Sequence, residues 1–206
     1  MNKNSTKTHL ILFSLALAVL IWSAINTSGY RIWLLESAPG IILLLITFIT
    51  YKRFRFTTLS YGIIVLSAII MFIGAKYTYS EVPLFNWLKD TYDFIDRNHY
   101  DRFGHFLKGL FAIVIREIII RQTSVKKGPW LYSITISFVL SIAALYEIIE
   151  WLVSKLTNDG EAAKDFLGTQ GDIWDTHWDM FLALLGTLVA LLLLSRLHDR
   201  LLKKHH

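Results

Sequence analysis

Long apolar stretches separated by short polar segments fill the sequence from Leu10 almost to Leu197. A helix that crosses a bilayer needs about 20 mostly apolar residues, because each residue adds about 1.5 Å of rise. Six such stretches recur, near residues 9–26, 31–50, 57–76, 102–121, 130–153 and 174–196. The pattern predicts an all-α fold, a polytopic transmembrane helical bundle that forms a single integral membrane domain over residues 1–206.

The segment between the third and fourth apolar stretches has a different pattern. After Pro83, apolar side chains recur at helical spacing, with lysine and aspartate side chains between them. Such an amphipathic pattern is typical of a helix that lies in the membrane interface. We therefore expect an interfacial helix near residues 84–98.

Composition supports the membrane assignment and excludes several kinds of chemistry. Of the residues, 54% are hydrophobic and only 18% are charged, which is too apolar for an ordinary soluble domain. There is no cysteine, which excludes disulfides, thiolate nucleophiles and cysteine-ligated zinc or iron–sulfur clusters. The net charge of +5 comes from basic residues in short turns beside apolar stretches, so we interpret it as a topology signal and expect no nucleic-acid partner.

The distribution of lysine and arginine predicts the orientation of the chain. An even number of crossings places both termini on one side of the bilayer. The termini and turns on that side carry 12 Lys and Arg residues, against 7 on the other side. Because cytoplasmic segments carry an excess of these residues, we expect both termini in the cytoplasm.

Ionisable side chains gather on the side opposite the termini. Asp101, His105 and Lys108 follow one another at four and three residues, so they share one face of the predicted fourth helix. On the fifth helix, Glu147 and Glu150 are three residues apart and therefore adjacent. These two helices bring three carboxyl groups to one level of the membrane.

The start of the sixth helix adds more carboxyl groups. Asp172, Asp175 and Asp179 are spaced so that they share one helical face. An ionisable group in a transmembrane helix costs about 2.5–3.5 kcal/mol at the bilayer centre, so such groups normally face a partner, a cavity or an ion. The carboxyl groups of the three helices therefore need positive charge nearby.

A divalent metal held by carboxylates and one imidazole would supply this charge. Carboxylate-rich ligation favours Mg²⁺, Mn²⁺ or Ca²⁺, and Zn²⁺ is compatible with it. The expected metal ligands are Glu147, Glu150, Asp172, Asp175 and Asp179.

The leading hypothesis is a cell-envelope enzyme or lipid-binding protein that engages a phosphate-bearing lipid headgroup, with a headgroup hydrolase or transferase as the specific form. Its catalytic candidates are His105, Asp101, Glu147 and Asp175. Its candidates for binding the substrate are Lys108, Arg116 and Gln170. The lipid bilayer is the expected partner.

Other interpretations stay open. Asp172 and Asp175 could cap the sixth helix, and His105 and Lys108 could pair with glutamates only to hold the bundle together. The same acids could form a proton relay or cation site of a transporter, or they could serve a purely structural role. A relay should continue through the membrane, whereas the half nearer the termini offers little beyond Arg116 and Glu117, which are expected to form a local ion pair.

Three motifs resemble the YjdF-like family of bacterial inner-membrane proteins. They lie at residues 97–105, 146–151 and 168–176, and read RNHYDRFGH, YEIIEW and GTQGDIWDT. The family is defined by a domain of unknown function, so the resemblance implies a multi-pass protein of the bacterial cytoplasmic membrane and no particular activity.

A more distant pattern is similar to the VanZ-like family, which is associated with glycopeptide tolerance and the cell envelope. The pattern consists of Asp101-x3-His105, Glu147-x2-Glu150 and Asp172-x2-Asp175-x3-Asp179-x6-Gly186. Where that family usually has Gln, Asn and Gly, this chain has Glu150, Asp179 and Leu182. The resemblance therefore implies a more acidic site than the family pattern.

Overall fold

A computed structural model of the chain describes residues 3–157 and 170–205, and these ranges contain helices and no strand. The elements are α1 (Lys3–Ala24), α2 (Tyr30–Thr50), α3 (Thr58–Lys76), α4 (Pro83–Thr91), α5 (Tyr100–Lys108), the 3₁₀ turn η1 (Gly109–Phe111), α6 (Ala112–Gln122), α7 (Pro129–Thr157) and α9 (Asp175–His205). Within these ranges, five helices are long and apolar enough to cross a membrane, namely α1, α2, α3, α7 and α9. The predicted all-α membrane bundle is confirmed.

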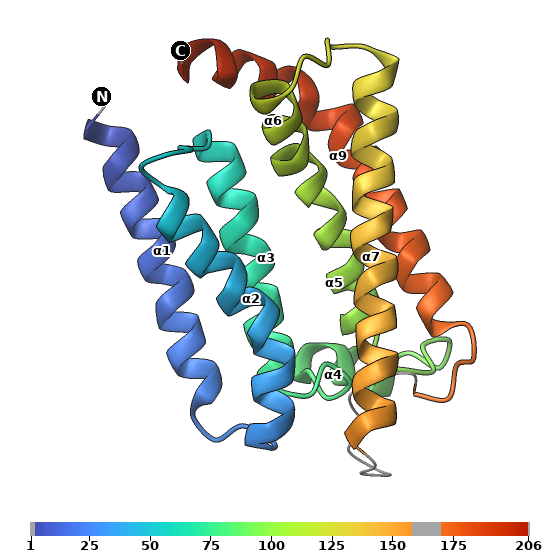
Figure 1. Cartoon of the computed structure of the whole chain (residues 1–206). Helices are drawn as coiled ribbons and strands as arrows, with labels where there is room; N and C mark the ends of the chain where they lie inside the picture. The colour runs from blue at the N-terminus through green and yellow to red at the C-terminus, as the bar shows by residue number, and fades with distance from the viewer. Residues whose placement is uncertain (1–2, 158–169, 206) are drawn as a thin grey trace.

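The fourth predicted span is not one continuous helix. Residues 102–121 fall into α5, η1 and α6, which follow one another along the bundle beside α7 and α9 (Figure 1). The break lies at Gly109, where the chain approaches α9 closely: a Cβ there would lie 2.5 Å from the carbonyl oxygen of Ala183. Close backbone packing thus coincides with the change of helix type.

The helices form two groups that meet along α3. Helices α1, α2 and α3 pack together, and α5, α6, α7 and α9 form the second group, whose α5, η1 and α6 contact α3 (Figure 1). Both chain termini lie at the same end of the bundle, as an even number of crossings requires (Figure 1). We call this the terminal end, and the opposite end, where α4 lies and α9 begins, the distal end.

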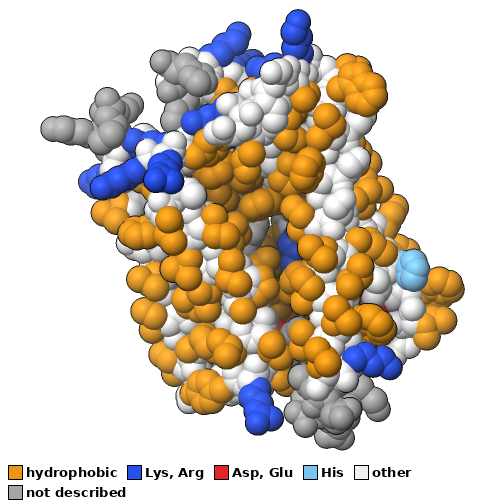
Figure 2. Space-filling model, viewed as in Figure 1, with side chains coloured by type: hydrophobic (Ala, Val, Ile, Leu, Met, Phe, Trp, Pro, Cys, Tyr) orange, Lys and Arg blue, Asp and Glu red, His pale blue; other side chains and the backbone are white. Residues whose placement is uncertain are grey.

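The surface matches that of a protein surrounded by lipid. Apolar side chains cover most of the face in Figure 2, and lysine and arginine side chains gather mainly at its two ends. Many large apolar side chains are exposed, such as those of Phe48, Leu192 and Ile49. This exposure would be unfavourable in water and is favourable in a bilayer.

Two predicted boundaries need correction. The interfacial helix ends at Thr91 and does not reach residue 98, because Tyr92 is already extended. Buried Asn98 donates hydrogen bonds to the carbonyl oxygen of Val82 at 3.1 Å and to Oδ1 of Asn86 at 2.8 Å, which fold the chain back onto α4. At the other boundary, α9 extends past the predicted residue 196 to His205. Its buried face continues there through His198 and Leu202.

Candidate functional site

A contact between two glycines brings α5 and α9 together. Gly109 follows α5, Gly186 lies in the middle of α9, and a Cβ on Gly186 would approach Cα of Gly109 to 3.3 Å. Thr187 Oγ1 also donates to the carbonyl oxygen of Gly109 at 3.3 Å. Small residues let transmembrane helices approach closely, and here they place the first turns of α5 against those of α9.

His105 of α5 lies at the centre of the resulting cluster and is only 2% exposed. Its Nε2 atom is 3.6 Å from Oδ1 of Asp101 and 3.7 Å from Oε1 of Glu147 on α7. One ligand atom each from Asp101, His105 and Asp179 lie within 4.8 Å of one another. Three helices therefore meet at the point where sequence spacing placed the acids.

Several buried polar atoms of this cluster have no hydrogen-bond partner among the described residues. They are Nδ1 of His105, Oε1 of Glu147, Oδ1 of Asp179 and Oδ2 of Asp175. A buried polar group without a partner costs about 1–3 kcal/mol, and most such groups in folded proteins have one. Imidazole nitrogen and carboxylate oxygen are also the donor atoms that divalent metals accept, so the donor set fits such an ion.

Asp172 and Asp175 have arginine partners, Arg97 and Arg102, which belong to the seven basic residues on the side opposite the termini. Arg97, itself buried, donates to Oδ1 of Asp175 at 2.5 Å, and Arg102 reaches the same oxygen at 3.2 Å. Arg102 also pairs with Asp172. These two aspartates are thus neutralised by side chains of the chain itself, which reduces their need for a metal.

The spacing predicts that Asp172 shares a helical face with Asp175, and this prediction is wrong. Helix α9 begins at Asp175, so Asp172 precedes it. Its Oδ1 accepts a hydrogen bond from the backbone N–H of Trp174 at 2.8 Å. This bond and the Arg102 guanidinium hold the pKa of the Asp172 carboxyl below its usual range. The interpretation of Asp172 as a capping residue therefore fits its contacts.

Gln170 joins the first and third motifs. Its Oε1 accepts from the backbone N–H of Asn98 at 3.0 Å, and its Nε2 donates to the carbonyl oxygen of Asn98 at 2.9 Å. Gln170 has a positive φ of 44°, which is an unfavourable backbone conformation, and these two hydrogen bonds stabilise it. Both ends of the Gln170 amide are used within the chain. Gly168 and Thr169 of the same motif lie outside the described residues, as does Lys164, one of the seven basic residues on the side opposite the termini.

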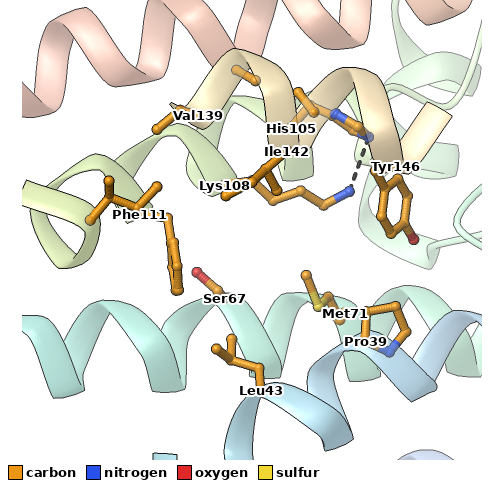
Figure 3. A pocket seen from close by; sticks show the side chains of 13 residues that line it. Pro39, Leu43, Ser67, Met71, His105, Lys108, Phe111, Val139, Ile142 and Tyr146 are labelled. Carbon is orange, nitrogen blue, oxygen red and sulfur yellow. Dashed lines mark hydrogen bonds between the residues drawn. The ribbon is translucent and has the colours of Figure 1, made fainter. Parts of the chain in front are cut away.

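Lys108 extends from the cluster into an apolar cavity. Its ammonium donates to Nε2 of His105 at 3.0 Å and lies 4.5 Å from the centre of the Tyr146 ring (Figure 3). Among the described residues, no carboxylate lies within 4.0 Å of it. The cavity has a volume of about 220 Å³ and lies between α2 and α3 on one side and α5, η1 and α7 on the other. Asp101 and Glu147 thus lie within 4.0 Å of His105, whereas no described carboxylate lies that close to Lys108.

Glu150 occupies the turn of α7 after Glu147, toward the distal end, and is half-buried. It belongs to the same acidic region, but the group of three mutually close ligand atoms does not include it. Of the expected ligands, Asp179 is in that group, and Asp101 and His105 join it from α5.

Arg116 lies away from the cluster, toward the terminal end. Its Nη1 donates to Nδ1 of His198 at 2.8 Å, and its Nη2 donates to Oδ1 of Asp199 at 2.8 Å. The expected local pair of Arg116 with Glu117 is wrong, because neighbouring residues of a helix point in different directions. Arg116 instead joins α6 to the last part of α9.

Glu117 is the centre of a second buried polar network. It is fully buried and accepts hydrogen bonds from Ser60 Oγ at 2.6 Å and from Thr57 Oγ1 at 2.8 Å. Arg121 pairs with it at 2.8 Å, and His198 Nε2 lies 3.2 Å from its Oε2. The terminal half is therefore more polar than the sequence had suggested. Residue spacing could indicate only Arg121, which follows Glu117 by four residues on α6, because the other partners come from α3 and α9.

Residues 8–200 match the family described as "Predicted membrane protein (DUF2238)". The chain belongs to this family. It is also 40% identical over 187 residues to "Inner membrane protein YjdF" of Escherichia coli (strain K12), a match that covers 90% of this chain and 88% of that protein. No solved structure matches the chain at a significant level.

Membership in the DUF2238 family confirms the resemblance drawn from the three motifs and shows an integral membrane protein with several crossings. The relative's name and the apolar helices together support an inner-membrane location. The more distant likeness to the VanZ-like family receives no support from these matches and stays a prediction.

Proposed function

We propose that the cluster at the distal end binds a divalent cation, and that this ion binds the phosphate of an envelope lipid headgroup. The ligands would be Asp101, His105 and Asp179, with Glu147 beside them. The observation that carries the proposal is the approach of three ligand atoms to within 4.8 Å of one another in a buried cluster. The partnerless oxygen atoms of Glu147 and Asp179 support it.

The ligand types narrow the choice of metal. Carboxylates suit Mg²⁺, Ca²⁺ and Mn²⁺, whereas imidazole suits Zn²⁺ and other transition metals. A site of two carboxylates and one imidazole therefore favours Mn²⁺ or Zn²⁺ over Mg²⁺ or Ca²⁺. Oxygen and nitrogen atoms bound to Zn²⁺ lie about 2.0–2.2 Å from the ion, so small side-chain rotations would close the present spacing.

The neighbouring residues assign further roles. Such an ion would polarise a phosphoryl oxygen. The Glu147 carboxylate, 3.7 Å from Nε2 of His105, could accept a proton from an attacking group. The arginine pairs of Asp175 would hold the start of α9, and thereby Asp179, in place. This arrangement suits either headgroup binding or a hydrolase or transferase.

The proposal includes the orientation expected from the basic residues. With both termini in the cytoplasm, the distal end faces outward, and the cluster lies near the outer leaflet. A headgroup in that leaflet would reach the site without crossing the bilayer.

Metal content tests the proposal directly. The detergent-purified protein should retain about one Mn²⁺ or Zn²⁺ per chain after dialysis against either ion, measured by elemental mass spectrometry. Asp179→Asn should lose the ion, whereas Asp90→Asn, on an exposed position of α4, should retain it. Wild-type protein without metal, or equal metal in both variants, would reject the metal site.

A cation- or proton-coupled carrier is the second candidate. The observation that favours it is the second buried network around Glu117, which shares α9 with the first cluster. Against it, Ala112 and Ile113 are apolar and buried between the two clusters, and the buried polar residues of α9 there, Thr187 and Ser195, carry no titratable group. Proteoliposomes with an internal pH-sensitive dye decide the point: flux no faster than in empty liposomes, under an imposed gradient, would reject this function.

A further inference from the structure

The apolar cavity beside Lys108 has a polar end and an apolar end. In Figure 3, Lys108, His105 and Tyr146 lie at one end, whereas Phe111 and Val139 lie at the other. Most other residues that line it are apolar. A ligand that fills the whole cavity would therefore need one charged group and one hydrocarbon part.

The length of the cavity matches a lipid chain. Its lining extends from His105 to Ile115, ten residues along α5, η1 and α6, which corresponds to about 15 Å at helical rise. The hydrocarbon core of a bilayer is about 30 Å thick, so one leaflet contributes about 15 Å. The cavity follows the bundle, in the direction that lipid chains take.

The cavity can be reached from the side. Figure 2 shows a hollow between the group of α1, α2 and α3 and helix α7, with lysine or arginine atoms visible in its depth. Ile142 of α7 lines the cavity and is 50% exposed, so it also belongs to the lipid-facing surface. A chain could therefore pass from the bilayer into the cavity without entering water.

The charge of Lys108 selects the kind of headgroup. Its ammonium has three donors, and its described polar partner is the single His105 nitrogen. Lys108 forms no ion pair within 4.0 Å among the described residues, although the carboxyl groups of Asp101 and Glu147 lie within electrostatic range of it. A cation within the membrane is costly without a close partner, and a phosphate is an anion that an ammonium binds well. The cavity thus offers a positive group where a chain would meet its headgroup.

We infer that this cavity binds one hydrocarbon chain of a lipid phosphate, and that the phosphate lies between Lys108 and the cluster of Asp101, His105 and Asp179. The inference rests on the proposed function for the ion that offsets the nearby carboxylates. The chain site itself depends only on the cavity and on Lys108. The occupant is a lipid with a terminal phosphate, and a neutral lipid of the same length should bind far less.

The test uses full-length protein in detergent and two probes of equal chain length, hexadecyl phosphate and hexadecanol. We expect the phosphate to bind at least tenfold more tightly than the alcohol, measured by microscale thermophoresis. Ala143→Leu, which fills the cavity, should weaken phosphate binding at least tenfold. Ala144→Leu adds the same bulk to the next residue, which does not line the cavity, and should change binding less than twofold.

Lys108→Met tests the headgroup contact, because methionine keeps an unbranched apolar side chain and removes the charge. We expect at least a tenfold loss for hexadecyl phosphate and little change for hexadecanol. Lys155→Met, on an exposed position of α7, is the control. Ser67→Leu narrows the cavity from α3 and replaces Ala143→Leu if that variant does not fold.

The outcomes separate this inference from the metal site. If the protein retains its metal, and neither Ala143→Leu nor Ser67→Leu weakens binding of hexadecyl phosphate, the site for the hydrocarbon chain is wrong and the metal site stands. Equal affinity for the alcohol and the phosphate would overturn the phosphate assignment. If the wild type holds no metal but still binds hexadecyl phosphate in a manner that depends on Lys108 and Ala143, the chain site stands and the proposed function falls.

Discussion

Gly186 of α9 lies against the backbone of Phe106 in α5, so closely that a Cβ on Gly186 would come within 1.9 Å of the Phe106 carbonyl oxygen. No side chain fits there without a shift of one helix. Because Phe106 follows His105 directly, this contact fixes the depth at which the His105 ring meets Asp179 of α9. Helix packing and the candidate site are thus determined at the same place.

Gly186→Ala should therefore destabilise the protein and open the cluster. Overpacking of a close contact typically costs about 1–3 kcal/mol. We expect a lower unfolding temperature in detergent, followed by intrinsic tryptophan fluorescence, together with loss of the ion from the metal site. Gly62→Ala is the matched control, because a Cβ at Gly62 of α3 meets nothing within 4 Å. Equal unfolding temperatures for the two variants would contradict the role of the Gly186 contact.

Much of the fold could be predicted from apolar stretch length alone. A membrane-spanning helix must satisfy its own backbone hydrogen bonds, so local sequence determines where it lies. Local spacing also predicted that Asp101 and His105, four residues apart, share one face of a helix. The meeting of these residues with Glu147 followed from topology, since each lies near the same end of its helix.

The partners of the charged residues could not be predicted in this way. Arg97 pairs with Asp175, 78 residues later, and Glu117 meets His198, 81 residues later. Helical periodicity relates residues three or four positions apart and contains no information on such pairs. The only sequence signal was the presence of Arg97 and Asp175 in two motifs of the same family resemblance.

Glu117→Ala should destabilise the protein strongly. The substitution removes the carboxylate that contacts four side chains near the terminal end, namely those of Thr57, Ser60, Arg121 and His198. Removal of one partner of a buried charged pair costs about 3–5 kcal/mol, because the other charge stays buried. We expect the largest drop in unfolding temperature among single carboxylate variants, and Glu81→Ala at an exposed position should have little effect. A small drop for Glu117→Ala would show that this network does not hold the bundle together.

Acid should weaken the start of α9 through Asp172. The pKa of this carboxyl is lower in the folded protein than in the unfolded chain, because it accepts from the Trp174 N–H and pairs with Arg102. Its contribution is therefore fully present above the unfolded pKa of about 3.9 and is lost as the pH falls through the folded pKa. Asp172→Asn should lower the unfolding temperature at pH 6, and the difference from wild type should shrink as the pH falls below about 4. A difference that stays constant between pH 6 and pH 3 would contradict this assignment.

Arg97→Met should weaken metal binding without removing any proposed ligand. Arg97 donates to Asp175 at 2.5 Å, and Asp175 precedes Asp179 by one helical turn, so the arginine holds the start of α9 and the position of Asp179. Residues that orient metal ligands typically change affinity by about 10–100-fold when they are replaced. We expect a loss of that size for Mn²⁺, measured by titration calorimetry of the purified protein. Arg53→Met, at an exposed turn of the terminal end, is the matched control and should bind as wild type does. Unchanged affinity in Arg97→Met would mean that Asp179 is held by α9 packing alone, and the Gly186 contact would then be sufficient to position the site.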